Sequence, residues 1–211
     1  GYSKDAPVPT LFDVLNGTHP ANSNPIIVDK ALNENLWISA GGYTIIQQMM
    51  MDIEGEKFPE LMNELVFQPL EMNNSRFNQS LNTEELKIAA TGYLRDGSMV
   101  KGKRHTYPEL ASNGLWATAE DLAKFVVNIQ QTLKDESNKG LSKDMTELML
   151  IPSAKNRYGQ YGLGFSIYNS EEEIFEPVYG VGMNSFLLGD EKSSTCTDAL
   201  CTWSYDKLLE K

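Results

Sequence analysis

The amino-acid sequence predicts an α+β fold in which a helical region lies beside a small antiparallel sheet. Apolar residues recur at spacings of three and four through most of residues 1–150, which is typical of helices. After Pro152 the pattern changes to short runs of β-branched and aromatic residues, which indicate strands. No internal repeat is visible. We therefore expect a single domain over residues 1–211, with a helical region over about 1–150 and a sheet with a C-terminal helix over about 151–211.

Composition excludes several classes of protein. The chain has 18 Lys and Arg against 29 Asp and Glu, a net charge of −11. Nucleic-acid binding needs a clustered cationic surface, so we expect no nucleic-acid partner. No apolar run approaches the roughly 20 residues that span a bilayer, so we expect no membrane span. Two histidines and the pair Cys196 and Cys201 are too few for a zinc site or a disulfide framework, and whether that pair is bonded stays open.

The first helix is expected between Pro9 and Gly17, inside an otherwise irregular segment that runs to about residue 36. Thr10 can cap its N-terminus and Gly17 can end it, while Leu11, Val14 and Leu15 share one face.

Two further helices are expected before residue 70. One begins near Gly42 and ends at Gly55, and core packing is the favoured use of Met49, Met50 and Met51. Its apolar positions recur at helical spacing: Ile45, Ile46, Met49, Met50 and Ile53. The next helix covers about residues 57–66 and ends before Pro69. Its inward positions are Phe58, Leu61, Met62 and Leu65.

Residues 71–117 are rich in turn formers, and we expect short strands there, including residues 91–94. Thr118 then caps a clear helix, and Asp121 completes a start that resembles a capping box. The buried stripe of that helix is Leu122, Phe125, Val126, Ile129 and Leu133. Ser142 begins another helix that contains Met145, Leu148 and Met149.

The C-terminal part is expected to form strands at residues 162–168, 174–179 and 185–188, followed by a helix over about 197–210. Glycines at 162, 164, 180 and 182 do not lie between a strand and a helix of a βαβ unit, so they indicate close backbone packing rather than nucleotide binding.

One short motif suggests a nucleophile. Ser98-Met99-Val100-Lys101 matches Ser-x-x-Lys, in which a lysine one helical turn away accepts the serine proton. Here the match lies between Gly97 and Gly102, where we expect a turn. We therefore interpret it as a coincidence.

Four segments resemble a known family. Residues 64–77 (ELVFQPLEMNNSRF), 112–125 (SNGLWATAEDLAKF), 37–44 (WISAGGYT) and 161–167 (YGLGFSI) are similar, in order and spacing, to segments of the serine β-lactamase-like and penicillin-binding-protein superfamily. The branch they resemble contains class C β-lactamases, D-Ala-D-Ala carboxypeptidases and related esterases.

The resemblance implies a β-lactamase/transpeptidase-like fold with a cleft between a helical region and a sheet. It implies acyl transfer, in which a serine attacks an ester, amide or β-lactam carbonyl. The implied partners are small acyl, peptide or β-lactam molecules, and neither a metal nor an organic cofactor is required. Relatives are typically exported to the periplasm or the cell exterior, but the sequence itself does not give a localisation.

The chain departs from this family at each catalytic station. The Ser-x-x-Lys helix would precede residue 1, Ile38 occupies the tyrosine position, and Ala40 replaces an Asn or Gly beside the matching Ser39. The third motif should fall near residues 178–182, where neither Lys nor His is present. No catalytic residue is intact by this comparison. The candidate cleft-lining residues are Ser39, Ala40, Tyr179, Gly180, Gly182 and Asn184.

These departures predict a truncated or degenerate member of the family that is inactive on its own. The alternatives are a non-catalytic binding or scaffold protein, and a chain that works only with a complementing N-terminal piece that carries the nucleophile. Apolar helix and strand faces without cover also predict an oligomer or a partner chain.

Overall fold

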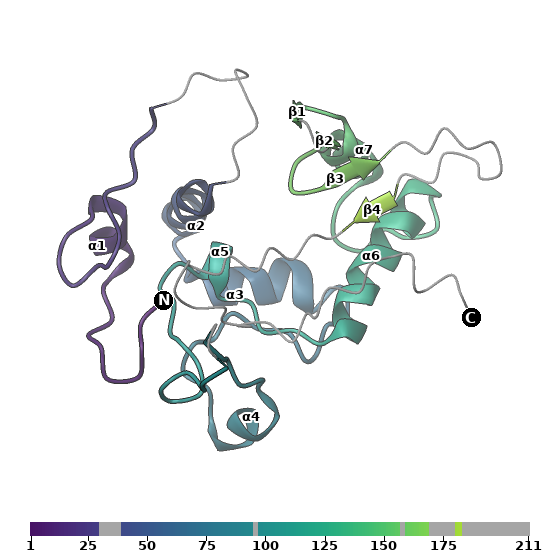
Figure 1. Ribbon diagram of the computed structural model, residues 1–211. Coiled ribbons are helices and arrows are strands. Elements are labelled where there is room, and N and C mark those ends of the chain that lie inside the picture. Colours follow the sequence, from purple (N-terminus) through teal and green to yellow (C-terminus); the bar gives the residue numbers. More distant parts are fainter. Residues whose placement is uncertain (30–38, 95–96, 157–158, 169–179, 183–211) are drawn as a thin grey trace. The chain divides into compact units, whose positions relative to one another are not determined.

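The computed structural model describes residues 1–29, 39–94, 97–156, 159–168 and 180–182 (Figure 1). These residues form two compact units. The first consists of Gly1–Val28 and Ser39–Leu122, and the second contains the described residues between 123 and 182. The expectation of a single domain stays a prediction.

The first unit begins with an extended segment and a short helix, α1 (Leu11–Asn16). The Thr10 side chain accepts a hydrogen bond from the Asp13 backbone N–H. The Asp13 carboxylate in turn accepts one from the Thr10 backbone N–H, which completes a capping box. Gly17 ends the helix at a φ of 63°, a left-handed conformation that glycine adopts without a Cβ penalty. The predicted caps of this helix are therefore confirmed.

The longest helix of the first unit is α2 (Ala40–Glu54), capped by Ser39 and ended by Gly55 at a φ of 70°. It begins two residues earlier than predicted. The predicted core packing of Met49 is wrong, because this side chain is 50% exposed. The buried residues of α2 are instead Thr44 and Gln47.

Gln47 explains why α2 turns a polar face inward. Its Nε2 donates to the Pro108 carbonyl at 3.1 Å, and its Oε1 accepts from the Ala111 backbone N–H at 3.0 Å. These bonds hold α2 against the short helix α5 (Leu110–Asn113). Pairing the buried Gln47 amide with these part-buried backbone groups outweighs the apolar pattern here, since a buried polar group left unpaired costs about 1–3 kcal/mol.

The third helix changes its winding part-way. α3 (Phe58–Met62) continues into the π-helix η1 (Asn63–Phe67), with Phe58, Leu61 and Phe67 buried. The prediction that Leu65 points inward is wrong, since it is 52% exposed. A π-turn takes more residues than an α-turn, so the inward position moves along the chain to Phe67.

Aromatic rings form the centre of this part of the first unit. The Phe58 and Phe77 rings meet edge-on at 4.9 Å between centroids, and Phe67 stacks on Phe77 at 5.7 Å. Such pairs add about 0.5–1.5 kcal/mol each beyond the area they bury.

Residues 71–117 contain two helices that the sequence analysis did not predict, α4 (Thr83–Ile88) and α5. The Asn82 and Glu85 side chains form a capping box at the start of α4. The expected strand at 91–94 is reduced to an isolated bridge between Tyr93 and Met99.

The predicted helix after Thr118 is α6 (Ala119–Leu133), whose Asp121 N–H donates to Thr118 Oγ1 at 3.2 Å. Its predicted stripe is confirmed at Leu122 and Ile129, which are buried, and Phe125 and Leu133 are partly buried. The last helix within the described residues, α7 (Lys143–Leu150), is capped by Ser142 as expected.

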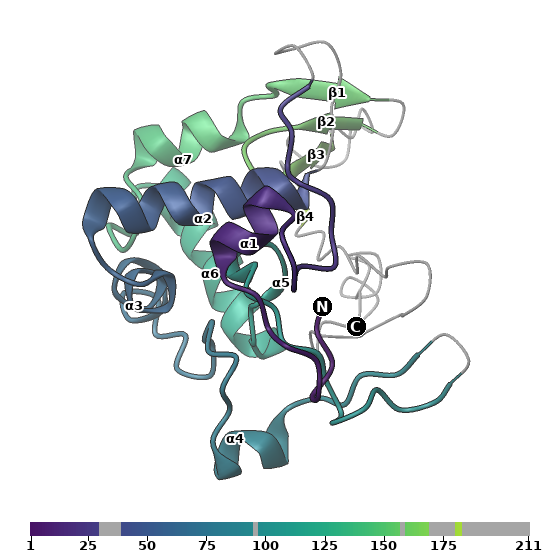
Figure 2. The same cartoon turned by 90° about the vertical axis from the view of Figure 1, so that its left-hand side faces the viewer.

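The second unit packs α6 and α7 around Ile129, Leu150 and Phe165. The Phe125 and Phe165 rings stack with centroids 6.4 Å apart. In this unit α7 runs next to the strands (Figure 2).

The sheet of the second unit is antiparallel with the order β1-β2-β3-β4. Its strands are β1 (Ala154–Asn156), β2 (Gly159–Tyr161), β3 (Ser166–Tyr168) and β4 (Gly180–Gly182). Of the expected strand at 162–168 only β3 is a strand, because Gly162 N–H bonds back to the Phe165 carbonyl in a turn. The other predicted strands at 174–179 and 185–188 and the helix at 197–210 lie outside the described residues.

Candidate active site

Ser39 and Ala40, which follow the position that the family resemblance assigns to a catalytic tyrosine, lie at the N-terminal end of α2. Ser39 is exposed and extended, with a φ of −128°, and its Oγ accepts a hydrogen bond from the Gly42 N–H at 3.0 Å. Ala40 begins the helix and carries only a methyl group. A Cβ on Gly41 would lie 2.9 Å from the Ile26 side chain, so the glycine permits a close approach at this end of the helix. Ile38 lies outside the described residues.

Ser39 acts as a helix cap in this arrangement. The hydroxyl of Ser39 is engaged with a backbone N–H as a helix cap, whereas an attacking serine needs a general base within hydrogen-bond reach. Ala40 has no polar group with which to bind a substrate or move a proton. Ser39 and Ala40 can therefore contribute shape and a hydroxyl dipole.

The Ser-x-x-Lys match at residues 98–101 does not form a catalytic pair. Leu94 N–H donates to the Ser98 carbonyl and Val100 N–H donates to the Gly92 carbonyl, so this stretch is extended rather than helical. In an extended chain, residues three apart point to opposite faces. Lys101 instead pairs with Asp5 at 2.5 Å. This geometry supports the interpretation of the match as a coincidence, which stays a prediction.

The sequence analysis missed a second match to the same motif. Ser204-Tyr205-Asp206-Lys207 also has a lysine three residues after a serine, and it lies outside the described residues. The spacing alone could have found it.

Two of the predicted cleft-lining residues of the third motif belong to β4. In the antiparallel pairing with β3, Gly180 lies opposite Tyr168 and Gly182 lies opposite Ser166. Because glycine has no Cβ, the backbone at these positions can approach another molecule closely. Tyr179 and Asn184 lie outside the described residues. Gly180 and Gly182 belong to the second unit, whereas Ser39 and Ala40 belong to the first.

The segments that carry the family resemblance are joined by hydrogen bonds in the first unit. Asp121 is fully buried, and its Oδ2 accepts from Asn74 N–H at 2.7 Å and from Ser75 Oγ at 2.9 Å. Arg76 and Trp116 exchange two backbone bonds of 2.8 Å. Sequence reasoning assigned Asp121 only to a helix cap and missed this link. Hydrogen bonds therefore join the segments 64–77 and 112–125 to each other.

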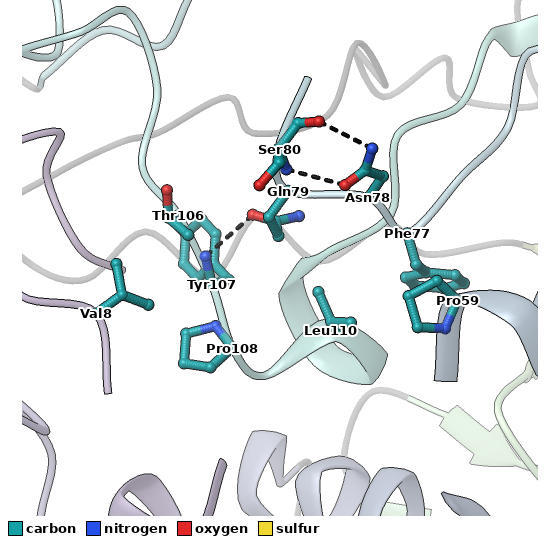
Figure 3. A pocket seen from close by; sticks show the side chains of 10 residues that line it. All are labelled: Val8, Pro59, Phe77, Asn78, Gln79, Ser80, Thr106, Tyr107, Pro108 and Leu110. Atoms are coloured by element: carbon teal, nitrogen blue, oxygen red, sulfur yellow. Dashed lines mark hydrogen bonds between the residues drawn. The ribbon is translucent and has the colours of Figure 1, made fainter. Parts of the chain in front are cut away.

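A pocket of about 320 Å³ opens in the first unit, and none of the predicted site residues is among those that line it (Figure 3). The Gln79 side chain is fixed there, because its Oε1 accepts from Tyr107 N–H and its Nε2 donates to the Gly114 carbonyl, both at 3.0 Å. The lining is mainly apolar: Val8, Pro59, Phe77, Asn78, Gln79, Ser80, Thr106, Tyr107, Pro108 and Leu110. None of these ten lining residues is acidic or basic.

The resolved pKa shifts belong to structural groups. Burial raises the pKa of the Tyr2 phenol. Hydrogen bonds from Thr10 lower the pKa of the Asp13 carboxyl, and the bond to Asp135 raises the pKa of the Lys143 amine. None of these groups lies at a predicted catalytic station.

The described residues lack the features of a metal site and of a membrane span. Within these parts of the chain, no group of three His, Cys, Asp or Glu side chains could hold a metal ion. No helix among them has the length and apolar character that crossing a membrane requires.

Solved structures with this fold include two penicillin-binding proteins and an amidase. The octameric penicillin-binding protein homologue from Pyrococcus abyssi is 22% identical with a TM-score of 0.54, over 78% of this chain and 37% of its own. The penicillin-binding protein from Bacillus halodurans is 21% identical with a TM-score of 0.53, over 80% and 50%. The D-amino acid amidase from Ochrobactrum anthropi SV3, complexed with D-phenylalanine, is 14% identical with a TM-score of 0.54, over 80% and 49%.

These similarities establish a β-lactamase/transpeptidase-like fold, and the chain spans half or less of the length of these three structures. No curated protein matches the chain. The sequence profile of the Beta-lactamase family matches residues 37–186, which include α2, the linked motif segments and the sheet. The chain therefore belongs to the Beta-lactamase family.

Proposed function

We propose that this chain is part of a serine hydrolase that acts by acyl transfer on an ester, amide or β-lactam carbonyl. The observation that carries the proposal is the family match over residues 37–186, which includes Ser39 at the start of α2 and the glycines of β4. Structural neighbours that are penicillin-binding proteins and a D-amino acid amidase support a substrate of this class. The residues proposed to line its cleft are those that the family resemblance assigns: Ser39, Ala40, Tyr179, Gly180, Gly182 and Asn184.

We propose further that the 211-residue chain alone binds such acyl compounds without efficient turnover. Support comes from Ser98 and Lys101, which lie in an extended segment, and from the apolar Ile38 and Ala40 at the tyrosine station. An enzyme of this type without its nucleophile accelerates the reaction at best roughly 10³- to 10⁴-fold over the rate in water.

A search for a covalent acyl adduct tests whether the chain is inactive on its own. The purified chain is incubated with a penicillin and examined by intact mass, and steady-state hydrolysis of nitrocefin and p-nitrophenyl esters is measured beside it. We expect no stable acyl adduct and no saturable turnover. An adduct would overturn the proposal of inactivity, and Ser39→Ala, Ser98→Ala and Ser204→Ala variants would identify the serine that carries it.

Binding at the candidate cleft is tested separately by hydrogen exchange. A penicillin or a peptide ending in D-Ala-D-Ala should slow exchange of the backbone amides at the start of α2. Ala40→Trp should abolish this protection by filling the site, whereas Ile88→Trp, on exposed α4, should not. Absence of protection in the unaltered chain would contradict acyl-ligand binding.

Two alternatives follow from the same residues. A non-catalytic binding or scaffold role is favoured by Ala40, which stands where the family motif has Asn or Gly. A chain that works with a separate N-terminal piece carrying Ser-x-x-Lys is tested by co-expression, which should restore acylation. A well-folded complex without acylation would reject that version.

We also propose that the chain forms an oligomer. The Pyrococcus abyssi neighbour is octameric, and several large apolar side chains of the first unit are exposed. Light scattering tests this, and a monodisperse monomer would contradict it.

A further inference from the structure

One face of α2 is both apolar and exposed. Ile45, Ile46, Met49 and Ile53 are 40%, 44%, 50% and 70% exposed. Their spacings of three and four residues place them on the same side of the helix. We call these four residues the α2 outer stripe. Contiguous apolar surface of this kind marks an interaction site more often than a single exposed residue does.

The opposite face fixes the rotation of α2 about its axis. Thr44 and Gln47 are 1% and 3% exposed, and both polar ends of the Gln47 amide are bonded to backbone groups at Pro108 and Ala111. Turning the helix to bury the stripe against the first unit would break both bonds. The stripe therefore faces away from the core of its own unit.

The charged residues of α2 are placed unfavourably with respect to its helix dipole. Its C-terminal turns carry Asp52 and Glu54 and no basic residue, and its first turn carries no acidic residue. Carboxylates near a helix C-terminus are unfavourable, whereas near an N-terminus each is stabilising by about 0.3–1 kcal/mol. An antiparallel copy of α2 would bring the acidic end of each helix beside the N-terminal end of the other.

We propose that the α2 outer stripe is a self-association surface, on which two copies of the chain pair α2 against α2 in antiparallel orientation with Met49 near the two-fold axis. Such a contact is isologous, so Ile45 of each copy faces Ile53 of the other. The inference rests on the oligomer proposed above and names its surface.

The size of the stripe sets the expected strength. Four side chains are far fewer than the roughly 20–30 residues per partner of a standard interface, so the dimer should be weak and dependent on concentration. Each copy carries a net charge of −11, so repulsion opposes association. Added salt should therefore strengthen the dimer, because it screens that repulsion while leaving apolar burial intact.

Sedimentation velocity over a wide range of protein concentration tests the surface. Met49→Lys should weaken dimerisation by at least about tenfold, which corresponds to roughly 1.4 kcal/mol. Ile88→Lys makes the same change at a 78% exposed residue of α4 and should dimerise like the unaltered chain. Circular dichroism checks that both variants remain folded.

A thiol at the axis gives a positive test. Met49→Cys should form a disulfide between the two introduced thiols under mild oxidation, identified by peptide mass spectrometry, and Ile88→Cys should not. An oligomer that Met49→Lys leaves unchanged would overturn this surface while the oligomer stands. A monomer at every concentration would overturn both this surface and the oligomer. Slow peroxide oxidation of Met49 in a monomer would also overturn both, because it would show that the stripe is covered within one chain.

Discussion

Replacing Asp121 by alanine removes the buried carboxylate that joins α6 to residues 74 and 75. Asp121 is 0% exposed, and its Oδ2 accepts bonds of 2.7 Å from Asn74 N–H and 2.9 Å from Ser75 Oγ. Hydrogen bonds to a charged group contribute about 1.5–3 kcal/mol each, and a buried donor left without a partner costs about 1–3 kcal/mol. Asn74 is exposed and can bond to water, so we expect Asp121→Ala to lower the free energy of unfolding by about 3 kcal/mol. For a chain of this size that corresponds to a fall in Tm of about 6–12 °C.

The assay is chemical denaturation followed by two probes, circular dichroism and intrinsic fluorescence, because coincident transitions are needed before a single free energy is meaningful. A double-mutant cycle with Ser75→Ala isolates the side-chain bond, and we expect a coupling energy of about 1 kcal/mol. Asp144→Ala is the matched control, since it also removes a carboxylate from the first turn of a helix but at an exposed position. Strictly additive effects of the Asp121 and Ser75 changes, or an Asp121→Ala cost no larger than the Asp144→Ala cost, would refute the reasoning.

Three further outcomes follow from the first unit. Gln47→Ala should lower the free energy of unfolding by about 2 kcal/mol, because two part-buried backbone groups lose their partners. Denaturant titration checks this. Gly17→Ala should destabilise the protein more than Gly55→Ala. Both glycines have a positive φ, but only at Gly17 would an added Cβ meet backbone, at 2.3 Å from the Pro25 nitrogen. A comparison of the two Tm values checks this. The pKa of the Asp13 carboxyl lies below its ordinary value because of its hydrogen bonds to Thr10. The contribution of Asp13 to stability is therefore present above its pKa in the unfolded chain and is lost as pH falls through its pKa in the folded chain. Thr10→Ala should raise the pKa of Asp13 in an NMR titration.

Local chemistry made several elements predictable from sequence. Thr10 and Gly17 bound α1, and Thr118 with Ser142 begin α6 and α7, because caps act within one turn of the residues that supply them. The same signal was present for α4 in Asn82 and Glu85, three residues apart, and was overlooked among the turn formers of that region.

The inward face of α2 could not be predicted in this way. Periodicity finds the apolar stripe, but the packed face is decided by Gln47, whose partners lie 61 and 64 residues further along the chain. A contact over that separation leaves no local pattern. The β1–β2 hairpin was missed for a related reason, since strands of three residues are too short for alternation to be visible.

The candidate site was predictable only as far as motifs reach. Resemblance identified the family and the segments 64–77 and 112–125, and the structure joins them through Asp121. The sequence predicted a turn rather than a helix at Ser98, because glycines on both sides of a motif disfavour a helix, and the segment is indeed not helical although it is extended. The roles of Ser39, Ala40, Gly180 and Gly182 stay predictions, as spacing does not tell which backbone faces a ligand.

The π-helix at Asn63–Phe67 matters for any residue-by-residue alignment of this chain with a homologue. A turn of this kind accommodates an additional residue compared with an α-helical turn. Where the homologue is α-helical throughout, an ungapped alignment would equate exposed Leu65 with a core position and shift the buried Phe67 out of register. A one-residue gap placed within 63–66 keeps Phe58 and Phe67 both matched to the interior, and substitution patterns in this helix should be interpreted only after that gap is introduced.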